Sequence, residues 1–211
     1  MISQISVNEQ SSIRIAGSSV IYFDPFRIRN SAHDADYVFI THAHFDHFSP
    51  EDIRKVCKPD TTYVAPETMA DELNKAGITD AVLLKPAVSV QVGEIAVETV
   101  PAYNQLKPFH PKKNGWLGYV ITVGGQRIYV AGDTDATKEA KSVSCDIALI
   151  PAGGTYTTDA REAAALVNTI HPGTAIPTHY GSVVGKPEDG DVFAKHVDAG
   201  IQVALKLGSA I

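Results

Sequence analysis

The sequence is poor in cysteine, with only Cys57 and Cys145 among its 211 residues, and it contains no C-x-x-C pair. Two distant cysteines without that spacing argue against a thiolate metal site and against a disulfide, so we expect two free thiols. The sequence also lacks the G-x-S-x-G motif of serine hydrolases, and no cysteine motif accompanies a histidine base. If the protein catalyses hydrolysis, its nucleophile must therefore come from solvent.

Long apolar runs and blocks of like charge are absent as well. Nowhere do eighteen apolar residues follow one another, and the first residues do not combine positive charge with an apolar stretch. We therefore expect no membrane span, no secretion signal and a cytoplasmic location. The net charge of −6 argues against broad electrostatic contact with nucleic acid. Glycine and proline are scattered and 44% of the residues are hydrophobic, which favours one domain over residues 1–211.

The most informative segment that is present reads His-Ala-His-Phe-Asp-His, at residues 42–47. Its three imidazoles and one carboxylate can supply nitrogen and oxygen ligands to Zn²⁺ or a similar divalent ion. The preceding residues 36–41 form a short apolar, β-branched run that predicts a buried strand. After the motif, Ser49 and Pro50 predict the N-cap and the first residue of a helix. The predicted site thus follows a strand, as is common where α/β proteins bind ligands.

The other hydrophobic patterns predict many short strands and then an alternation of helices and strands. Gly124 and Gly125 predict a tight hairpin, and Asp159 with Glu162 predicts a capping box at the start of a helix. The expected strands cover residues 2–7, 12–16, 20–23, 36–41, 88–92, 95–100, 117–123, 126–130, 145–150, 174–177 and 201–205. The expected helices cover residues 50–56, 67–76, 160–169 and 191–199. The pattern alone indicates an α/β protein with many short strands.

Three segments of the chain resemble, in the same order, the motifs of the metallo-β-lactamase superfamily. Residues 41–47 match its H-x-H-x-D-H motif, residues 128–135 resemble its strand that ends in Gly-Asp, and residues 175–181 resemble the strand that delivers its last histidine. The resemblance implies a four-layer αβ/βα sandwich, in which two sheets face each other and helices cover the outside. Within the superfamily, the chain is most similar to the small, single-domain predicted metal-dependent hydrolases that include the ascorbate-phosphate lactonase-like proteins.

The resemblance also implies a set of metal ligands. One or two divalent ions are expected, with zinc first and manganese, iron or nickel as alternatives, because these ions accept the same nitrogen and oxygen ligands. His42 and His44 would hold the first ion with a third histidine, and Asp133 would bridge two ions. The ligands implied for the second ion are Asp46, His47 and His179.

The third histidine departs from the superfamily pattern. Asn104 occupies its usual position after the strand 95–100, and the next histidine is His110. We favour His110 as the ligand, because Pro108 and Pro111 restrict its loop and present the imidazole in a defined direction. The alternatives are a weak oxygen ligand at Asn104 or a single bound ion.

Further residues are expected around the ions. We predict that Asp24 and Asp135 orient or support the ligands, since metal-bound histidines commonly donate their second N–H group to a carboxylate or carbonyl. Substrate contacts are predicted at Asn104, Thr155 and Tyr180, which lie in or next to the loops expected to surround the pocket.

The resemblance implies a hydrolase whose nucleophile is a metal-activated hydroxide. Asp46 would orient this hydroxide or accept its proton, and the reaction would take place at an ester, lactone or phosphodiester of a small molecule. The nearby Lys107, Lys112 and Lys113 favour an anionic substrate, unless they only solubilise their loop. The alternatives are a nuclease acting on RNA or DNA, which the net acidity disfavours, redox chemistry at iron, and a non-catalytic metal-binding module of the same fold.

Overall fold

Two β-sheets form the centre of the computed structural model, which describes residues 1–209 and residue 211. The first sheet has the strand order β1-β2-β3-β4-β5-β6. Its strands are Ile5–Val7 (β1), Ile13–Ala16 (β2), Val20–Phe23 (β3), Ala35–Phe39 (β4), Cys57–Pro66 (β5) and Val82–Leu84 (β6). Pairing is antiparallel from β1 to β3 and parallel from β3 to β6.

The second sheet has the strand order β13-β12-β11-β10-β9-β8-β7. Its strands are Ser89–Val92 (β7), Ile95–Pro101 (β8), Leu117–Val123 (β9), Gln126–Val130 (β10), Ile147–Pro151 (β11), Thr174–Thr178 (β12) and Gln202–Val203 (β13). Pairing is antiparallel from β7 to β10 and parallel from β10 to β13. The antiparallel pairing of β9 with β10 confirms the predicted hairpin. Gly124 and Gly125 form its turn with φ angles of +57° and +75°, which glycine adopts without steric cost.

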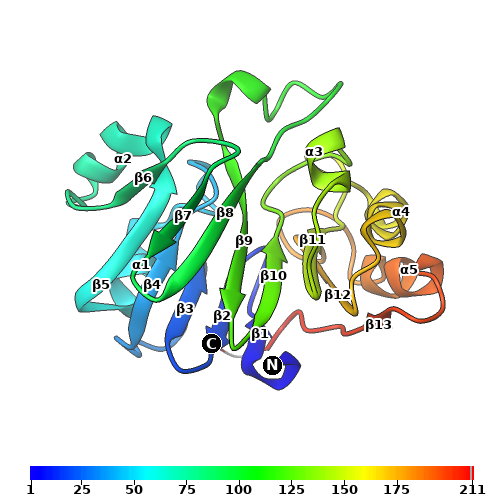
Figure 1. Cartoon of the computed structure of the whole chain (residues 1–211), viewed down its shortest axis with the longest axis horizontal. Coiled ribbons are helices and arrows are strands. Elements are labelled where there is room, and N and C mark those ends of the chain that lie inside the picture. Colours follow the sequence, from blue (N-terminus) through cyan, green and yellow to red (C-terminus); the bar gives the residue numbers. More distant parts are fainter. Residues whose placement is uncertain (210) are drawn as a thin grey trace.

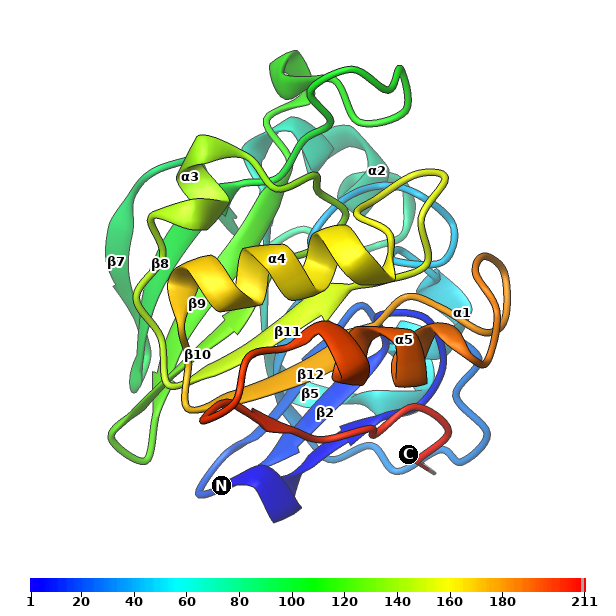
Figure 2. The ribbon, with the colours of Figure 1, turned by 90° about the vertical axis from the view of Figure 1, so that its right-hand side faces the viewer.

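α-Helices cover the outer faces of the two sheets. They are Pro50–Val56 (α1), Ala70–Lys75 (α2), Lys138–Lys141 (α3), Ala160–Ile170 (α4) and Asp189–His196 (α5). Figure 1 shows α1 and α2 on the side of the first sheet and α3, α4 and α5 on the opposite side, and Figure 2 shows α4 and α5 lying across β11 and β12. The predicted N-cap at Ser49 of α1 and the predicted capping box at Asp159 and Glu162 of α4 are both confirmed.

Three apolar clusters separate these layers. The cluster between the two sheets includes Phe39 of β4 and Ile121 of β9. A second cluster, between the second sheet and its helices, includes Phe193 of α5, and the third, between the first sheet and its helices, includes Ile53 of α1. Burial of apolar side chains on both faces of each sheet is the main driving force for this arrangement. The four-layer sandwich that the resemblance implied is therefore confirmed.

Several elements differ from those that the sequence predicts. Residues 57–66 and 82–84, which carry no strand prediction, form β5 and β6. A proline and an aspartate in the first half of β5 disfavour a strand, but its second half is mostly buried and pairs with β4. Ile2–Gln4 form a 3-10 helix instead of the beginning of a strand. The short helix α3 is also unpredicted, and Thr137 stabilises its first turn as the N-cap.

Strands from both sheets deliver loops to one edge of the molecule. In the first sheet β3 runs parallel to β4, and in the second sheet β8, β10, β11 and β12 share one direction. The sheets are joined at this edge, where Leu117 donates its N–H to the carbonyl of Thr41 at 3.1 Å and the Tyr119 hydroxyl donates to the carbonyl of Ile40 at 2.7 Å. In Figure 1, the segment between β8 and β9 rises above the sheets at this edge.

Cys57 and Cys145 are both free and half-buried, as expected for two isolated cysteines. Burial, together with the nearby carboxylate of Asp146, raises the pKa of the Cys145 thiol to about 12, so this thiol is protonated at neutral pH.

No helix in the described part of the chain has the length and apolar character that crossing a membrane requires.

Candidate metal centre

The loop between β4 and α1 carries the His-Ala-His-Phe-Asp-His segment. This loop folds into a tight turn, because the backbone N–H groups of His47 and Phe48 both donate to the carbonyl oxygen of His44, at 3.0 and 2.8 Å. His42, Asp46 and His47 are buried in the turn, and His44 is half-buried. Four potential ligands from six residues therefore share one small volume.

His42 and His44 meet His110, which comes from the loop after β8. One ring nitrogen of each lies within 4.8 Å of the others, and His42 Nε2 is 3.1 Å from His44 Nδ1. Two nitrogens bound to one tetrahedral Zn²⁺ at about 2.0–2.1 Å are roughly 3.4 Å apart, so the observed spacing fits a shared ion. Trp116 packs against this cluster, with its ring centroid 4.9 Å from those of both His42 and His44.

Asp46 and His47 meet His179, which follows β12, and their ligand atoms also lie within 4.8 Å of one another. Asp46 Oδ2 is 3.2 Å from His179 Nε2 and 3.7 Å from His47 Nε2. His179 has a left-handed φ of +56°, which is unfavourable for a residue other than glycine. Such backbone strain is common at functional sites, where the surrounding contacts hold it in place.

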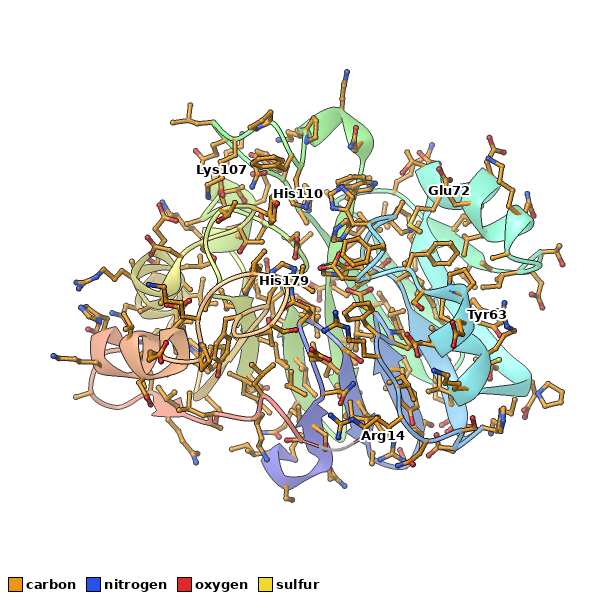
Figure 3. The ribbon with its side chains drawn as sticks, turned by 180° about the vertical axis from the view of Figure 1, so that it is seen from behind. Arg14, Tyr63, Glu72, Lys107, His110 and His179 are labelled. Atoms are coloured by element: carbon orange, nitrogen blue, oxygen red, sulfur yellow. The ribbon has the colours of Figure 1, made fainter. Side chains whose placement is uncertain are left out.

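Asp133 lies between these two clusters. Its Oδ2 is 3.2 Å from His110 Nε2 and 3.3 Å from His179 Nε2, and its Oδ1 is 3.2 Å from His47 Nε2. Figure 3 shows His110 and His179 reaching the same central region from different loops. The preceding Gly132 has a φ of +63° and passes so close to β9 that a Cβ would lie 3.0 Å from a carbonyl oxygen. One carboxylate therefore adjoins both clusters, where the resemblance implies a bridging ligand.

Several buried atoms of the centre have no hydrogen-bond partner among the described residues. They include His47 Nε2, His110 Nε2 and Asp133 Oδ1. An unsatisfied buried polar group costs about 1–3 kcal/mol, and native proteins contain few of them. A divalent cation would give all three atoms a partner, so the residues present fit a bound metal.

Charge and burial place His42, Asp46 and Asp133 in the protonation states that bind metal. Burial lowers the pKa of His42 well below its usual value, so this imidazole is neutral at pH 7. Burial opposes the ionisation of Asp46, but the hydrogen bond with His179 and the charge of His47 outweigh it and lower the pKa of Asp46 to about 2. The pKa of Asp133 is also well below its usual value, because the same two histidines outweigh its burial. Neutral imidazole and ionised carboxylate are the ligand forms.

Asp24, directly after β3, holds His47 in place. Its Oδ2 accepts hydrogen bonds from His47 Nδ1 at 2.7 Å and from the Thr41 hydroxyl at 2.6 Å, and its Oδ1 accepts the Thr41 backbone N–H at 2.8 Å. Because a carboxylate only accepts, Nδ1 of His47 carries the proton and Nε2 faces Asp133. Burial opposes a second proton on His47, but the carboxylates of Asp133 and Asp24 raise its pKa well above the usual value. A metal ion bound at Nε2 would therefore have to displace a proton from His47, whereas Nδ1 keeps its proton on the hydrogen bond to Asp24. Asp24 thus lies where an orienting residue is predicted.

His110, and not Asn104, reaches the first two histidines. The side-chain oxygen of Asn104 accepts from the backbone N–H and the ring Nδ1 of His110, each at 3.0 Å. The Asn104 amide nitrogen donates to Asp135 Oδ1 at 3.0 Å and to the Tyr156 carbonyl at 2.8 Å. Asp135 Oδ1 also accepts from Lys107 Nζ at 2.7 Å. Asn104 therefore positions His110, and Asp135 supports the loop that carries both residues.

Gln10 is a residue of the centre that the sequence does not reveal. It lies in the turn between β1 and β2 with a φ of +53°, and it is fully buried. Its side-chain nitrogen is 3.5 Å from Asp46 Oδ2, and its backbone carbonyl accepts the His179 N–H at 2.9 Å. Gln10 thus links two members of the second cluster. A glutamine in a polar turn carries no metal-ligand pattern, so no local signal points to it.

A cavity of about 350 Å³ opens onto the centre. Its lining consists of His44, Phe45, Asp46, Phe109, Asp133, Tyr156, His179, Val183 and Val184. The lining does not include Asn104, Thr155 or Tyr180, at which substrate contacts are predicted. Thr155 is exposed, whereas Tyr180 is buried in the apolar cluster beneath α5. Substrate contact at these residues stays a prediction without support from the geometry.

The lysines of the loop after β8 do not line this cavity. Lys107 Nζ is 2.7 Å from Asp135 Oδ1, and Lys112 Nζ is 2.6 Å from Glu139 Oε1. Lys113 is exposed on the same loop. Their positions therefore do not support the prediction that they attract an anionic substrate to the centre.

Comparison with known sequences places this chain among proteins of one superfamily. A sequence model described as the Beta-lactamase superfamily domain matches residues 4–179, which is most of the chain. The chain is 30% identical over 216 residues to a UPF0173 metal-dependent hydrolase from Thermococcus onnurineus, and the match covers 95% of each chain. Such a match over nearly the whole of both chains indicates a common fold and a common ancestor.

Comparison with solved structures gives the same result. A protein from Parabacteroides distasonis, proposed to be a metal-dependent hydrolase, superposes with a TM-score of 0.79 at 30% identity, covering 96% of this chain and 91% of the other. Igni18, a metallo hydrolase from Ignicoccus hospitalis, superposes with a TM-score of 0.77 at 20% identity, covering 97% and 95%. At the lower identity, the second match supports the fold alone.

Proposed function

The chain belongs to the beta-lactamase superfamily, and from this premise we propose that it is a metal-dependent hydrolase with a binuclear metal centre. The observation that carries the proposal is the position of Asp133 between two ligand clusters, in which several buried ligand atoms have no hydrogen-bond partner among the described residues. The proposed ligands are His42, His44 and His110 for the first ion, Asp46, His47 and His179 for the second, and Asp133 for both.

The proposed ions are divalent, with zinc expected first and manganese, iron or nickel as alternatives. Such an ion lowers the pKa of a bound water to about 7 and so supplies a nucleophile at neutral pH. Asp46 lines the cavity, and its pKa of about 2 makes it a poor acceptor for a proton at neutral pH. We therefore assign Asp46 to binding and to orienting the attacking water, and not to storing its proton.

The proposed reaction is hydrolysis of an ester, a lactone or a phosphodiester of a small molecule. The cavity of about 350 Å³ lies within the usual range of small-molecule sites. A net charge of −6 and ion-paired lysines do not favour a polynucleotide. The narrower resemblance to ascorbate-phosphate lactonase-like proteins stays a prediction.

Elemental analysis of protein purified without a histidine tag tests the metal centre. We expect about two ions per chain in the wild type and about one in His110→Ala, which removes a ligand of the first ion. Leu106→Ala is the matched control, because Leu106 is 98% exposed on the same loop and should leave metal content unchanged. One ion or none in the wild type, unaffected by His110→Ala, would contradict a binuclear centre.

Hydrolysis by the metal-loaded protein is then measured on esters, lactones and phosphodiesters. We expect turnover by the wild type and a loss of roughly 10²-fold or more in Asp46→Ala at saturating metal, the size expected when a reacting group is no longer held in position. Full metal loading without hydrolysis of any class would favour a non-catalytic metal-binding module. Cleavage confined to RNA or DNA would favour a nuclease.

A further inference from the structure

Apart from the proposed ligands, the walls of the cavity over the metal centre are apolar. They consist of Phe45, Phe109, Tyr156, Val183 and Val184. These residues come from four separate loops: Phe45 follows β4, Phe109 follows β8, Tyr156 follows β11 and the two valines follow β12. Phe109 and Tyr156 meet edge to face, with ring centroids 4.7 Å apart, and so form one continuous aromatic surface. A cavity of this composition offers burial to an apolar group and few hydrogen bonds to a polar one.

The apolar walls adjoin the reacting centre through the chain itself. Phe45 lies between His44 and Asp46 in sequence, and Phe109 directly precedes His110. Each aromatic ring is therefore anchored one residue away from a proposed ligand. A group bound against these rings would be adjacent to the bond that the centre attacks.

Large apolar side chains are unusually exposed around this cavity. Phe45 is 65% exposed, Phe109 42% and Val183 38%. Single exposed apolar residues are common on protein surfaces, but exposed apolar residues that gather in one place commonly mark a binding site. Phe45 is supported from behind by Phe26, with ring centroids 5.9 Å apart, so it is held at the cavity and does not fold back into the core.

Positive charge is missing from the same surface. No lysine or arginine belongs to the described lining of the cavity. Lys107 and Lys112, which lie on either side of Phe109 on its loop, are paired with Asp135 and Glu139 instead. A negatively charged group bound against the aromatic walls would lose its hydration without gaining an ion pair, which is costly.

We propose that the cavity binds substrates through a neutral aryl or alkyl group placed next to the scissile bond. This inference rests on the proposed function, because the apolar group is useful only beside a hydrolytic centre. The walls formed by Phe45, Phe109, Tyr156 and the two valines select the group, while the metal centre acts on the adjacent polar bond.

Small metal-chelating probes test this selection without requiring the natural substrate. The probes are acetohydroxamate, phenylacetohydroxamate and succinate monohydroxamate, which share one chelating group and differ in the substituent. Their affinities are measured by titration calorimetry on zinc-loaded protein. Phenylacetohydroxamate should bind at least about tenfold more tightly than acetohydroxamate, the gain expected for burying roughly 60 Å² of apolar surface. Succinate monohydroxamate should show no gain.

Two variants on one loop locate the effect. Phe109→Ala should remove most of the preference for phenylacetohydroxamate, measured as the ratio of its affinity to that of acetohydroxamate in the same variant. Leu106→Ala should change neither, because Leu106 is exposed on the same loop and is not in the lining. The wild-type preference retained in full by Phe109→Ala would overturn the proposed location.

The outcomes separate this inference from the function on which it rests. If acetohydroxamate itself fails to bind zinc-loaded protein, the proposed metal centre is wrong and the inference falls with it. If acetohydroxamate binds and the phenyl group adds nothing, or if the succinate probe binds most tightly, only the inference is overturned.

Discussion

The side-chain oxygen of Asn104 lies 3.0 Å from the ring Nδ1 of His110. The amide can only be oriented this way, because its nitrogen faces two acceptors, Asp135 Oδ1 and the Tyr156 carbonyl. His110 then carries its proton on Nδ1, and its Nε2 is left free towards Asp133 at 3.2 Å. Asn104 thus orients His110, which lies six residues further along the same loop.

Asn104→Ala should weaken binding of the first ion roughly 10- to 100-fold, the usual effect of removing a residue that orients a ligand. Zinc titration of metal-free protein against a competing chelator measures the change. Gln105→Ala is the matched control, because the exposed side-chain amide of Gln105 donates to the carbonyl of Ala136 and not to His110. Wild-type affinity in Asn104→Ala would show that the loop backbone alone holds His110.

Asp24→Asn should lower the affinity for the second ion by a similar factor of roughly 10 to 100. Both carboxylate oxygens of Asp24 accept hydrogen bonds, from His47 and from Thr41, whereas the amide of asparagine has only one accepting oxygen. The metal-free variant should also lose about 1–3 kcal/mol of stability, since buried donors are left unpaired. Thermal unfolding with and without zinc separates the two effects. Asp34→Asn, which affects a half-exposed ion pair with Arg14, should cost at most about 1 kcal/mol and leave metal binding intact. Equal effects of the two substitutions would refute a special role for Asp24.

Gln10→Ala tests the link between the first hairpin and the second cluster. The lost contact with Asp46 is long, at 3.5 Å, so we expect a decrease in second-ion affinity of only about fivefold, equivalent to about 1 kcal/mol. The backbone bond to His179 stays in place in this variant, which should therefore fold normally. Glu9→Ala, at the adjacent half-buried position, serves as the control, because Glu9 pairs with Arg27 and Ser182 and not with the proposed ligands. A loss as large as that of a ligand variant would mean that Gln10 itself contacts the ion.

Gly118→Ala should destabilise the protein by about 1–3 kcal/mol, because its Cβ would lie 2.6 Å from the backbone oxygen of Ala131. Ala131 directly precedes Gly132 and Asp133, so the displaced strand should also lower metal affinity. Gly173→Ala is the control, since its Cβ would meet nothing closer than 3.4 Å. Chemical denaturation and zinc titration of both variants measure the two effects. A Gly118→Ala protein as stable as the control would show that β9 can shift without cost.

Local sequence patterns account for most of the fold and for part of the centre. The continuous apolar run of β11, the glycine pair after β9 and the capping box of α4 each depend on residues a few positions apart, so they were predictable. β5 was not, because its polar first half hides a strand that is stabilised by pairing with β4. Strand pairing of this kind is a property of the sheet and not of the segment.

The sequence by itself determined the ligand types and their first grouping, because His42, His44, Asp46 and His47 lie on one short turn. Only the tertiary structure decided that His110 completes this group, since contacts from the distant loops after β10 and β11 orient its loop. The same holds for the buried Gln10 and for the apolar cavity walls, which are assembled from separate loops. Residues so far apart in the sequence come into contact only when the two sheets pack together. No local sequence pattern therefore predicts which of them will be neighbours.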